Sequence, residues 1–230
     1  MSYNLKMYQF ENLKMSIKEN LIQIQSFLSS HVTLVAVSKT KPVSDLMDAY
    51  NADQRVFGEN KIQEMTEKWE QMPKDIQWHM IGHVQTNKVK YMAEYVSLIH
   101  GVDSLKLLQE INKQAAKHNR VIDCLLQIYI AEEETKFGLD ENELEEILHF
   151  VQNDKMNNIR VIGLMGMATY TDNQTQIKKE FLNLKSIFDK LKTKHCQLNT
   201  ISMGMSGDYK LAIKCGSTMV RIGSSIFGTR

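Results

Sequence analysis

Short apolar runs and amphipathic segments alternate along most of the 230-residue chain. The apolar runs are rich in valine, isoleucine and other strand-forming residues, which favours β-strands over helices. Eight runs are expected as strands, at residues 33–37, 55–57, 77–81, 96–100, 122–130, 160–165, 198–202 and 218–222.

The segments between these runs place apolar residues three and four positions apart, which is the spacing of a helix with one buried face. The longest is 173–193, where Ile177, Phe181 and Leu184 share a face. Another amphipathic segment, 3–29, precedes the first strand and is expected to flank the fold. The remaining helices are expected near residues 43–52, 60–70, 85–94, 104–118, 140–152 and 207–214.

Strands that alternate with helices predict an α/β fold of parallel strands joined by helical crossovers. A single closed (β/α)8 TIM barrel accounts for eight such units. An open doubly wound sheet is the alternative, but no G-x-G-x-x-G turn follows the first strand. With two prolines and no linker-like stretch, one domain spanning 1–230 is expected, with an N-terminal helix at 3–29 and the barrel at 32–228.

Composition and charge give no support for nucleic acid or a membrane as the binding partner. The chain is 43% hydrophobic and 24% charged, with a formal net charge of +1, so nothing in its charge favours nucleic acid or an anionic membrane. No apolar run is long enough to span a membrane. Three widely spaced cysteines without a C-x-x-C motif, and an N-terminus unlike a signal peptide, favour the reduced cytoplasm.

Two histidines four positions apart, His79 and His83, have a spacing that suits a metal site when both lie on a helix. Here they straddle the end of a predicted strand, so no metal site is expected. His79 is expected to line the barrel interior instead.

The stretch LVAVSKTKP, residues 34–42, places Lys39 at the end of a buried strand. Functional residues of such barrels lie at the C-terminal ends of the strands. Partial removal from water lowers the pKa of a lysine, and a neutral amine attacks an aldehyde to form an imine. The alternative is that Lys39 pairs with an acid such as Glu59 or extends into solvent.

The stretch GSTMVRIGSSIFG, residues 216–228, surrounds the last strand with small residues. Gly223, Ser224 and Ser225 offer backbone N–H groups and hydroxyls to an anion, and Ser206 follows the seventh strand on the same side. The loops after strands 7 and 8 are the usual phosphate site of these barrels. Tight packing that closes the barrel is the alternative interpretation.

The first and last strands are neighbours in a closed barrel, so the amine and the anion site suit one ligand with an aldehyde and a phosphate. Pyridoxal 5′-phosphate (PLP) has both groups. A sugar phosphate bound by a Schiff-base aldolase has them too, so the residues alone leave both ligands open.

Five stretches, in order over residues 32–228, resemble the PLP homeostasis protein family of the YggS/PROSC type. They are LVAVSKTKP, FGENKIQE (57–64), WHMIGHVQTNK (78–88), GLMGMATYT (163–171) and SMGMSGDYKLAIKCGSTMVRIGSSIFG (202–228). The resemblance implies a barrel of the alanine-racemase-like type, PLP fold type III, without a second β domain. It also implies a protein that carries or buffers PLP in intracellular vitamin B6 homeostasis.

The resemblance implies a set of cofactor-binding residues: Lys39, Val37, Asn60, Ser206, Arg221, Gly223 and Ser224. Lys39 is implied to hold PLP as a Schiff base, Val37 to pack against its ring, and Asn60 to lie near it. The other four match positions that hold the phosphate. The arginine can instead face the pyridine nitrogen, as in racemases of this fold type, and the sequence leaves both roles open.

A racemase needs two acid/base groups, one on each face of its substrate. Lys39 is one, and Tyr170 and Cys215 are the candidates for the second. Because racemases complete their site with a further domain, we expect a carrier with no catalytic residues. A PLP-dependent racemase or related enzyme is the alternative. PLP-dependent apo-enzymes are candidate recipients, and a monomer is expected because no heptad seam is present.

Overall fold

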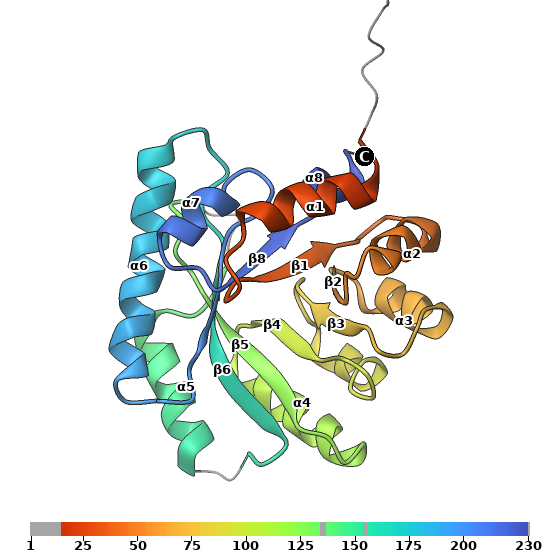
Figure 1. Cartoon of the computed structure of the whole chain (residues 1–230). Coiled ribbons are helices and arrows are strands. Elements are labelled where there is room, and N and C mark those ends of the chain that lie inside the picture. The colour runs from red at the N-terminus through yellow and green to blue at the C-terminus, as the bar shows by residue number, and fades with distance from the viewer. Residues whose placement is uncertain (1–14, 134–136, 154–155, 230) are drawn as a thin grey trace, which may run out of the picture.

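The strands form a closed barrel of parallel neighbours in the order β1 to β8, as the alternating pattern predicts (Figure 1). The computed structural model describes residues 15–133, 137–153 and 156–229. Its strands are β1 (Thr33–Val37), β2 (Val56–Glu59), β3 (Gln77–Met80), β4 (Leu98–Val102), β5 (Ile122–Ile128), β6 (Ile159–Gly166), β7 (Thr200–Ser202) and β8 (Met219–Ile222). The prediction of a (β/α)8 barrel is therefore confirmed.

Helices surround the barrel, with α1 before the first strand, α8 after the last, and the others between strands. They are α1 (Ile17–Phe27), α2 (Val43–Asn51), α3 (Ile62–Gln71), α4 (Leu105–Lys117), α5 (Glu141–Asn153), α6 (Gln174–Lys192), α7 (Tyr209–Lys214) and α8 (Ser224–Phe227). The first begins with a capping box, in which Ser16 and Glu19 satisfy each other's backbone N–H groups. Of the expected helix 3–29, residues 3–14 lie outside the described residues, and the helix ends at Phe27.

Several bounds differ by a few residues from the predicted ones: β2 runs to Glu59, β5 ends at Ile128, and β7 begins at Thr200. Two further differences have a cause in the structure. The helix expected at 85–94 is a short 3-10 helix, η1 (Thr86–Tyr91), whose buried anchor is Val89 alone. One apolar anchor does not define the continuous face that a longer helix needs. The fourth strand begins at Leu98 rather than 96, because Val96 closes the preceding turn through its amide to Met92 O.

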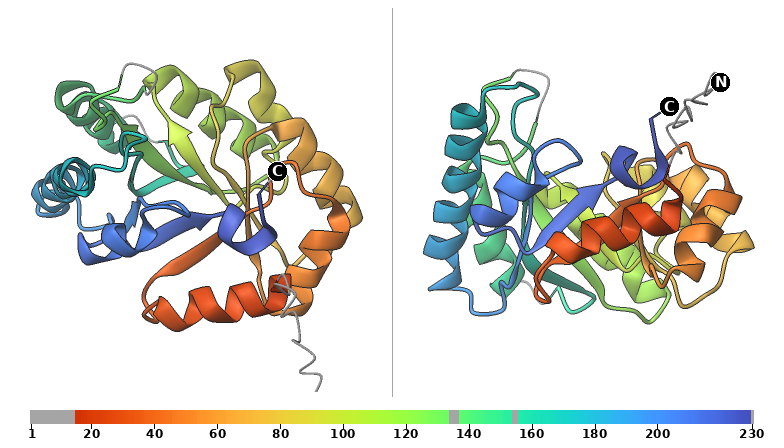
Figure 2. Two further views of the ribbon diagram at one scale, coloured as in Figure 1. Left: turned by 90° about the horizontal axis from the view of Figure 1, so that it is seen from above. Right: turned by 45° about the horizontal axis from the view of Figure 1, so that its top comes forward.

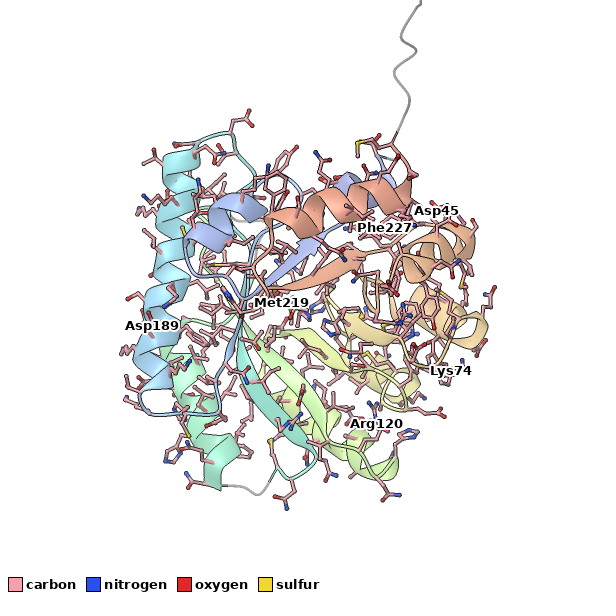
Figure 3. All side chains as sticks on the ribbon, in the orientation of Figure 1. Asp45, Lys74, Arg120, Asp189, Met219 and Phe227 are labelled. Carbon is pink, nitrogen blue, oxygen red and sulfur yellow. The ribbon has the colours of Figure 1, made fainter. Side chains whose placement is uncertain are left out.

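Two apolar layers hold these elements together. The larger lies between strands and helices and includes Trp78, Phe57 and Phe181, all fully buried. The smaller fills the barrel itself and is built from strand residues: Val35, Leu98, Leu125, Met165 and Met219. Figure 3 shows Met219 near the middle of the molecule. Because side chains alternate along a strand, residues two positions further along face the same interior.

The barrel closes where its first and last strands pair. Val35 lies opposite Arg221 and Ala36 opposite Ile222, so the C-terminal ends of β1 and β8 are adjacent. Outside this seam α1 packs along α8 (Figure 2), and Asn20 Nδ2 donates to the carbonyl of Ile226 at 2.9 Å. Within the described ranges, none of the helices is both long enough and apolar enough to cross a membrane.

Candidate functional site

Lys39 lies two residues after Val37, the last residue of β1, and is half-buried. Val35 belongs to the barrel interior, so the alternation of a strand directs Val37 toward the same side, and Lys39 follows in the turn after the strand. The strand thus brings Lys39 to the C-terminal mouth of the barrel, as the sequence predicts.

The backbone on both sides of Lys39 is clamped by charged side chains from β2 and α3. Lys68 Nζ donates to the Ser38 carbonyl at 2.8 Å. The Ser38 hydroxyl donates to Glu59 Oε1 at 2.6 Å, and the amide of Thr40 donates to Glu64 Oε1 at 2.5 Å. Thr40 has φ 63°, a left-handed conformation that is costly for a β-branched residue. These contacts fix the turn that carries the lysine.

Lys68 also completes a buried ion-pair cluster. Its ammonium donates to Glu59 Oε1 at 2.8 Å and to Glu64 Oε1 at 2.7 Å. Burial raises the pKa of Glu59, while the hydrogen bond and charge of Lys68 oppose that rise. Sequence reasoning considered Glu59 as a partner of Lys39 and missed Lys68. The available signal was a lysine on the apolar face of α3, in register with Ile62 and Met65.

Small residues after β7 and β8 form an edge of hydrogen-bonding groups beside Lys39. The Gly223 amide donates to Ser206 Oγ at 3.2 Å, so the structure brings these two predicted residues together. A Cβ at Gly223 would lie 3.1 Å from the Val37 carbonyl oxygen and 3.2 Å from Val37 Cβ. The absence of a side chain therefore lets β8 approach β1 at this point.

Ser224 and Ser225 start α8 and are exposed. The amides of Ile226 and Phe227 both donate to the Gly223 carbonyl, so the helix itself uses amides only from Ile226 onward. The two serine amides precede that first turn and are available to a ligand. This edge offers amide and hydroxyl donors, which suit an anion.

Arg221 lies one layer deeper, on β8, and is 4% exposed. Its Nη1 donates to the carbonyl and the hydroxyl of Ser202 at 2.9 and 2.6 Å, and its Nη2 donates to the Gly166 carbonyl at 3.1 Å. Burial lowers the pKa of Arg221 to about 10, against the opposing charge of Asp208, so the guanidinium remains charged at neutral pH.

Two histidines continue this polar layer across the barrel. His100 Nδ1 lies 3.1 Å from Ser202 Oγ, and His100 Nε2 lies 3.1 Å from His79 Nδ1. His79 lines the interior, as expected. Sequence reasoning missed the roles of His100 and Ser202, because they meet only when distant strands come into register in the closed barrel.

Asn60 follows β2, the neighbour of β1, and is half-buried. Its carbonyl oxygen lies 2.4 Å from where a Cβ of Gly82 would be, so the ends of β2 and β3 approach closely. His83 pairs with Asp103 at 3.3 Å, away from His79. Across the described residues, no group of three or more His, Cys, Asp and Glu side chains is placed to hold a metal ion.

Comparison with known proteins identifies relatives over almost the whole chain. The family model "Alanine racemase, N-terminal domain" matches residues 14–230. A pyridoxal phosphate homeostasis protein of Pasteurella multocida is 38% identical, over 94% of this chain and 98% of its own. A protein of the same name from Aquifex aeolicus is 39% identical, over 86% of each chain.

Solved structures with the same barrel fold are also found. PipY of Synechococcus elongatus, with PLP bound, superposes with a TM-score of 0.85 and 32% identity, over 93% of this chain and 100% of PipY. An alanine racemase of Clostridium difficile superposes with a TM-score of 0.78 at 17% identity, over 94% of this chain and 60% of the racemase. The latter likeness concerns the fold alone.

Proposed function

The chain belongs to the family of pyridoxal phosphate homeostasis proteins, and on this premise we propose that it binds PLP and carries or buffers it in intracellular vitamin B6 homeostasis. The observation that carries the proposal is the junction of β1 and β8. There the amine of Lys39 and the edge formed by Gly223 and Ser206 lie at adjacent strand ends. PipY, a relative with PLP bound, has the same fold.

The groups at this junction fit the aldehyde and the phosphate of PLP. The amine of Lys39 would hold the aldehyde end of the cofactor as a Schiff base, with water as the leaving group. Ser206 and Ser224 supply hydroxyl and amide donors to the phosphate, and Gly223 takes part in the same edge through its amide, which donates to Ser206 Oγ. Val37, which contacts Gly223, packs against the ring, and Asn60 lies near it at the end of β2.

Arg221 is assigned to the ring nitrogen rather than to the phosphate. In PLP the phosphate arm is attached next to the aldehyde-bearing carbon, whereas the nitrogen lies opposite that carbon. A ring held by Lys39 and by the edge at Gly223 therefore turns its nitrogen away from both. Arg221 lies two residues before Gly223 on the same strand, and its contacts with Ser202 and Gly166 support a place deeper in the barrel.

The positions of the two candidate second acid/base groups support a carrier rather than a racemase. Tyr170 is 92% exposed, and its backbone amide donates to Glu133 Oε2 at 3.1 Å. Cys215 is 4% exposed at the end of α7, and burial raises the pKa of its thiol. An exposed ring and a buried thiol at the end of α7 favour the carrier, because racemisation needs a proton donor held opposite Lys39.

The proposed setting is the cytoplasm, with PLP-dependent apo-enzymes as recipients and the protein as a monomer. Delivery requires that the imine be reversible, and a Schiff base is opened by water or by exchange with another amine.

Borohydride reduction of PLP-loaded protein tests this function. We expect a yellow protein whose reduced cofactor is attached to the peptide containing Lys39. Lys39→Ala should lose the attachment. Lys41→Ala is the matched control and should keep it, because Lys41 Nζ instead donates to the Phe227 carbonyl at 3.0 Å. Protein that stays colourless with added PLP refutes the proposal, and amino-acid racemisation that depends on Lys39 refutes the carrier role.

A further inference from the structure

A hydrogen-bonded chain crosses the barrel interior beneath the proposed cofactor. It links His79 on β3, His100 on β4, Ser202 on β7 and Arg221 on β8, and each of these residues is at most 4% exposed. His100 and Arg221 lie two residues beyond Leu98 and Met219, which belong to the apolar filling of the barrel. These four hydrogen-bonded residues therefore form the layer directly above the apolar filling, on the side of the C-terminal mouth of the barrel.

The chemistry of arginine and the single proton of a hydroxyl group together favour one direction for these hydrogen bonds. A guanidinium has five N–H donors and no acceptor, so Ser202 Oγ must accept from Arg221. The hydroxyl proton of Ser202 then needs an acceptor, and among the described residues His100 Nδ1, at 3.1 Å, is the one within hydrogen-bond distance. This leaves the proton of His100 on Nε2, which donates to Nδ1 of His79, so that His79 also carries its proton on Nε2.

Electrostatics keeps both rings neutral. Burial lowers the pKa of His79 to about 3. Burial, and then the neighbouring His79 and Arg221, hold the pKa of His100 well below its usual value. Asp208, which is half-buried, is the acid whose charge acts on the guanidinium. Both rings therefore stay neutral across the physiological pH range.

These hydrogen bonds also determine which N–H groups of Arg221 remain free to bind a ligand. Within the described residues, Ser202 and Gly166 accept three hydrogen bonds from the guanidinium, so two of its five N–H groups remain for a ligand. Since both acceptor residues are strand residues, the guanidinium cannot turn without breaking contacts on β6 and β7.

We propose that His79, His100 and Ser202 are positioning residues that hold the Arg221 guanidinium in one orientation toward the ring of the bound cofactor. This rests on the proposed function, because the ring is that of PLP. Ser202 accepts the charged donor directly, and the two histidines hold the Ser202 hydroxyl in its accepting orientation.

Three serine variants separate positioning from packing. Ser202→Ala removes the accepting hydroxyl, whereas Ser202→Thr keeps it. The matched control is Ser217→Ala, because Ser217 is also buried and its hydroxyl donates to the carbonyls of Met203 and Met219 at 2.8 and 2.9 Å. The measurements are the PLP dissociation constant, the absorbance of the bound cofactor as a function of pH, and the thermal midpoint.

Ser202→Ala should keep PLP on Lys39 but bind it about tenfold more weakly, since a hydrogen bond to a charged group is worth about 1.5 kcal/mol or more. The pH midpoint of the cofactor absorbance should shift as well. Ser202→Thr should restore both values, and Ser217→Ala should change only the thermal midpoint. Wild-type affinity and spectrum in folded Ser202→Ala overturn the proposal.

The tautomers are tested without PLP. Side-chain 15N spectra of the unloaded protein should show His79 and His100 neutral with the proton on Nε2, the signals being assigned from His79→Gln and His100→Gln. A charged ring or an Nδ1 proton at either position overturns the proposal, even where Ser202→Ala fails to fold. Failure of wild-type protein to bind PLP, with the expected tautomers present, instead refutes the proposed function.

Discussion

Replacing Lys68 by methionine should strongly destabilise the protein, because it leaves Glu59 charged and buried. Lys68 makes three charge-assisted hydrogen bonds of 2.7–2.8 Å, to Glu59, Glu64 and the Ser38 carbonyl. The side chains of Lys68 and Glu59 are only 6% and 0% exposed. Breaking a buried pair of this kind costs about 3–5 kcal/mol. We therefore expect the urea midpoint to fall by roughly 1 M or more.

The loss should depend on pH through Glu59. Burial already raises the folded-state pKa of this carboxyl group, and removal of Lys68 raises it further. A raised folded-state pKa means that the folded protein binds the proton more tightly than the unfolded chain, so stability falls as the pH rises through that pKa. The deficit of Lys68→Met should be largest at neutral pH and shrink on acidification.

Two variants make the measurement specific. Lys190→Met removes an exposed lysine that pairs with Glu141, with side chains 59% and 57% exposed, and should leave the midpoint almost unchanged. The double variant Glu59→Gln/Lys68→Met removes the unpaired charge and should be more stable than Lys68→Met alone. If Lys68→Met and Lys190→Met unfold at the same urea concentration, or if the deficit does not depend on pH, the reasoning is wrong.

Two further predictions concern packing and thiol chemistry. A Cβ at Gly163 would lie 1.8 Å from the Thr200 carbonyl oxygen, whereas one at Gly207 meets nothing within 4 Å. Gly163→Ala should therefore lower the thermal midpoint sharply or abolish soluble expression, and Gly207→Ala should do neither; equal midpoints would contradict this. Cys196 is exposed and Cys124 is buried, where burial raises the pKa of the thiol. A thiol reagent should label Cys196 quickly in the native protein, and rapid labelling that persists in Cys196→Ser would show that a buried thiol is accessible.

The parts of the fold that depend on local pattern could be predicted from the sequence. Apolar runs and helical spacing gave the eight strands, and the place of Lys39 at a strand end followed from the barrel. The 3-10 segment at 86–91 could not be predicted in this way, because its six residues contain one buried anchor. The start of β4 depends on which of two apolar residues, Val96 or Leu98, enters the barrel.

The parts of the site that depend on register could not be predicted. His100 and Ser202 are 102 residues apart in sequence, and their side chains meet only in the closed barrel. The contact of Gly223 with Val37 likewise requires the pairing of the first and last strands. The role of Lys68 could have been predicted, since a lysine in register with buried Ile62 and Met65 needs a buried acid.

The pairing of β1 with β8 has a consequence for synthesis on the ribosome. Lys39 is synthesised early, whereas Gly223 and Ser224 are synthesised about 180 residues later. The hydrogen bond between Asn20 on α1 and the Ile226 carbonyl likewise forms only after α8 has been made. A nascent chain or a fragment that lacks β8 therefore presents Lys39 without the residues proposed to bind the phosphate. On the proposed assignment of the site, full binding of PLP is expected only once β8 has been made, so incomplete translation products should compete weakly for the cofactor.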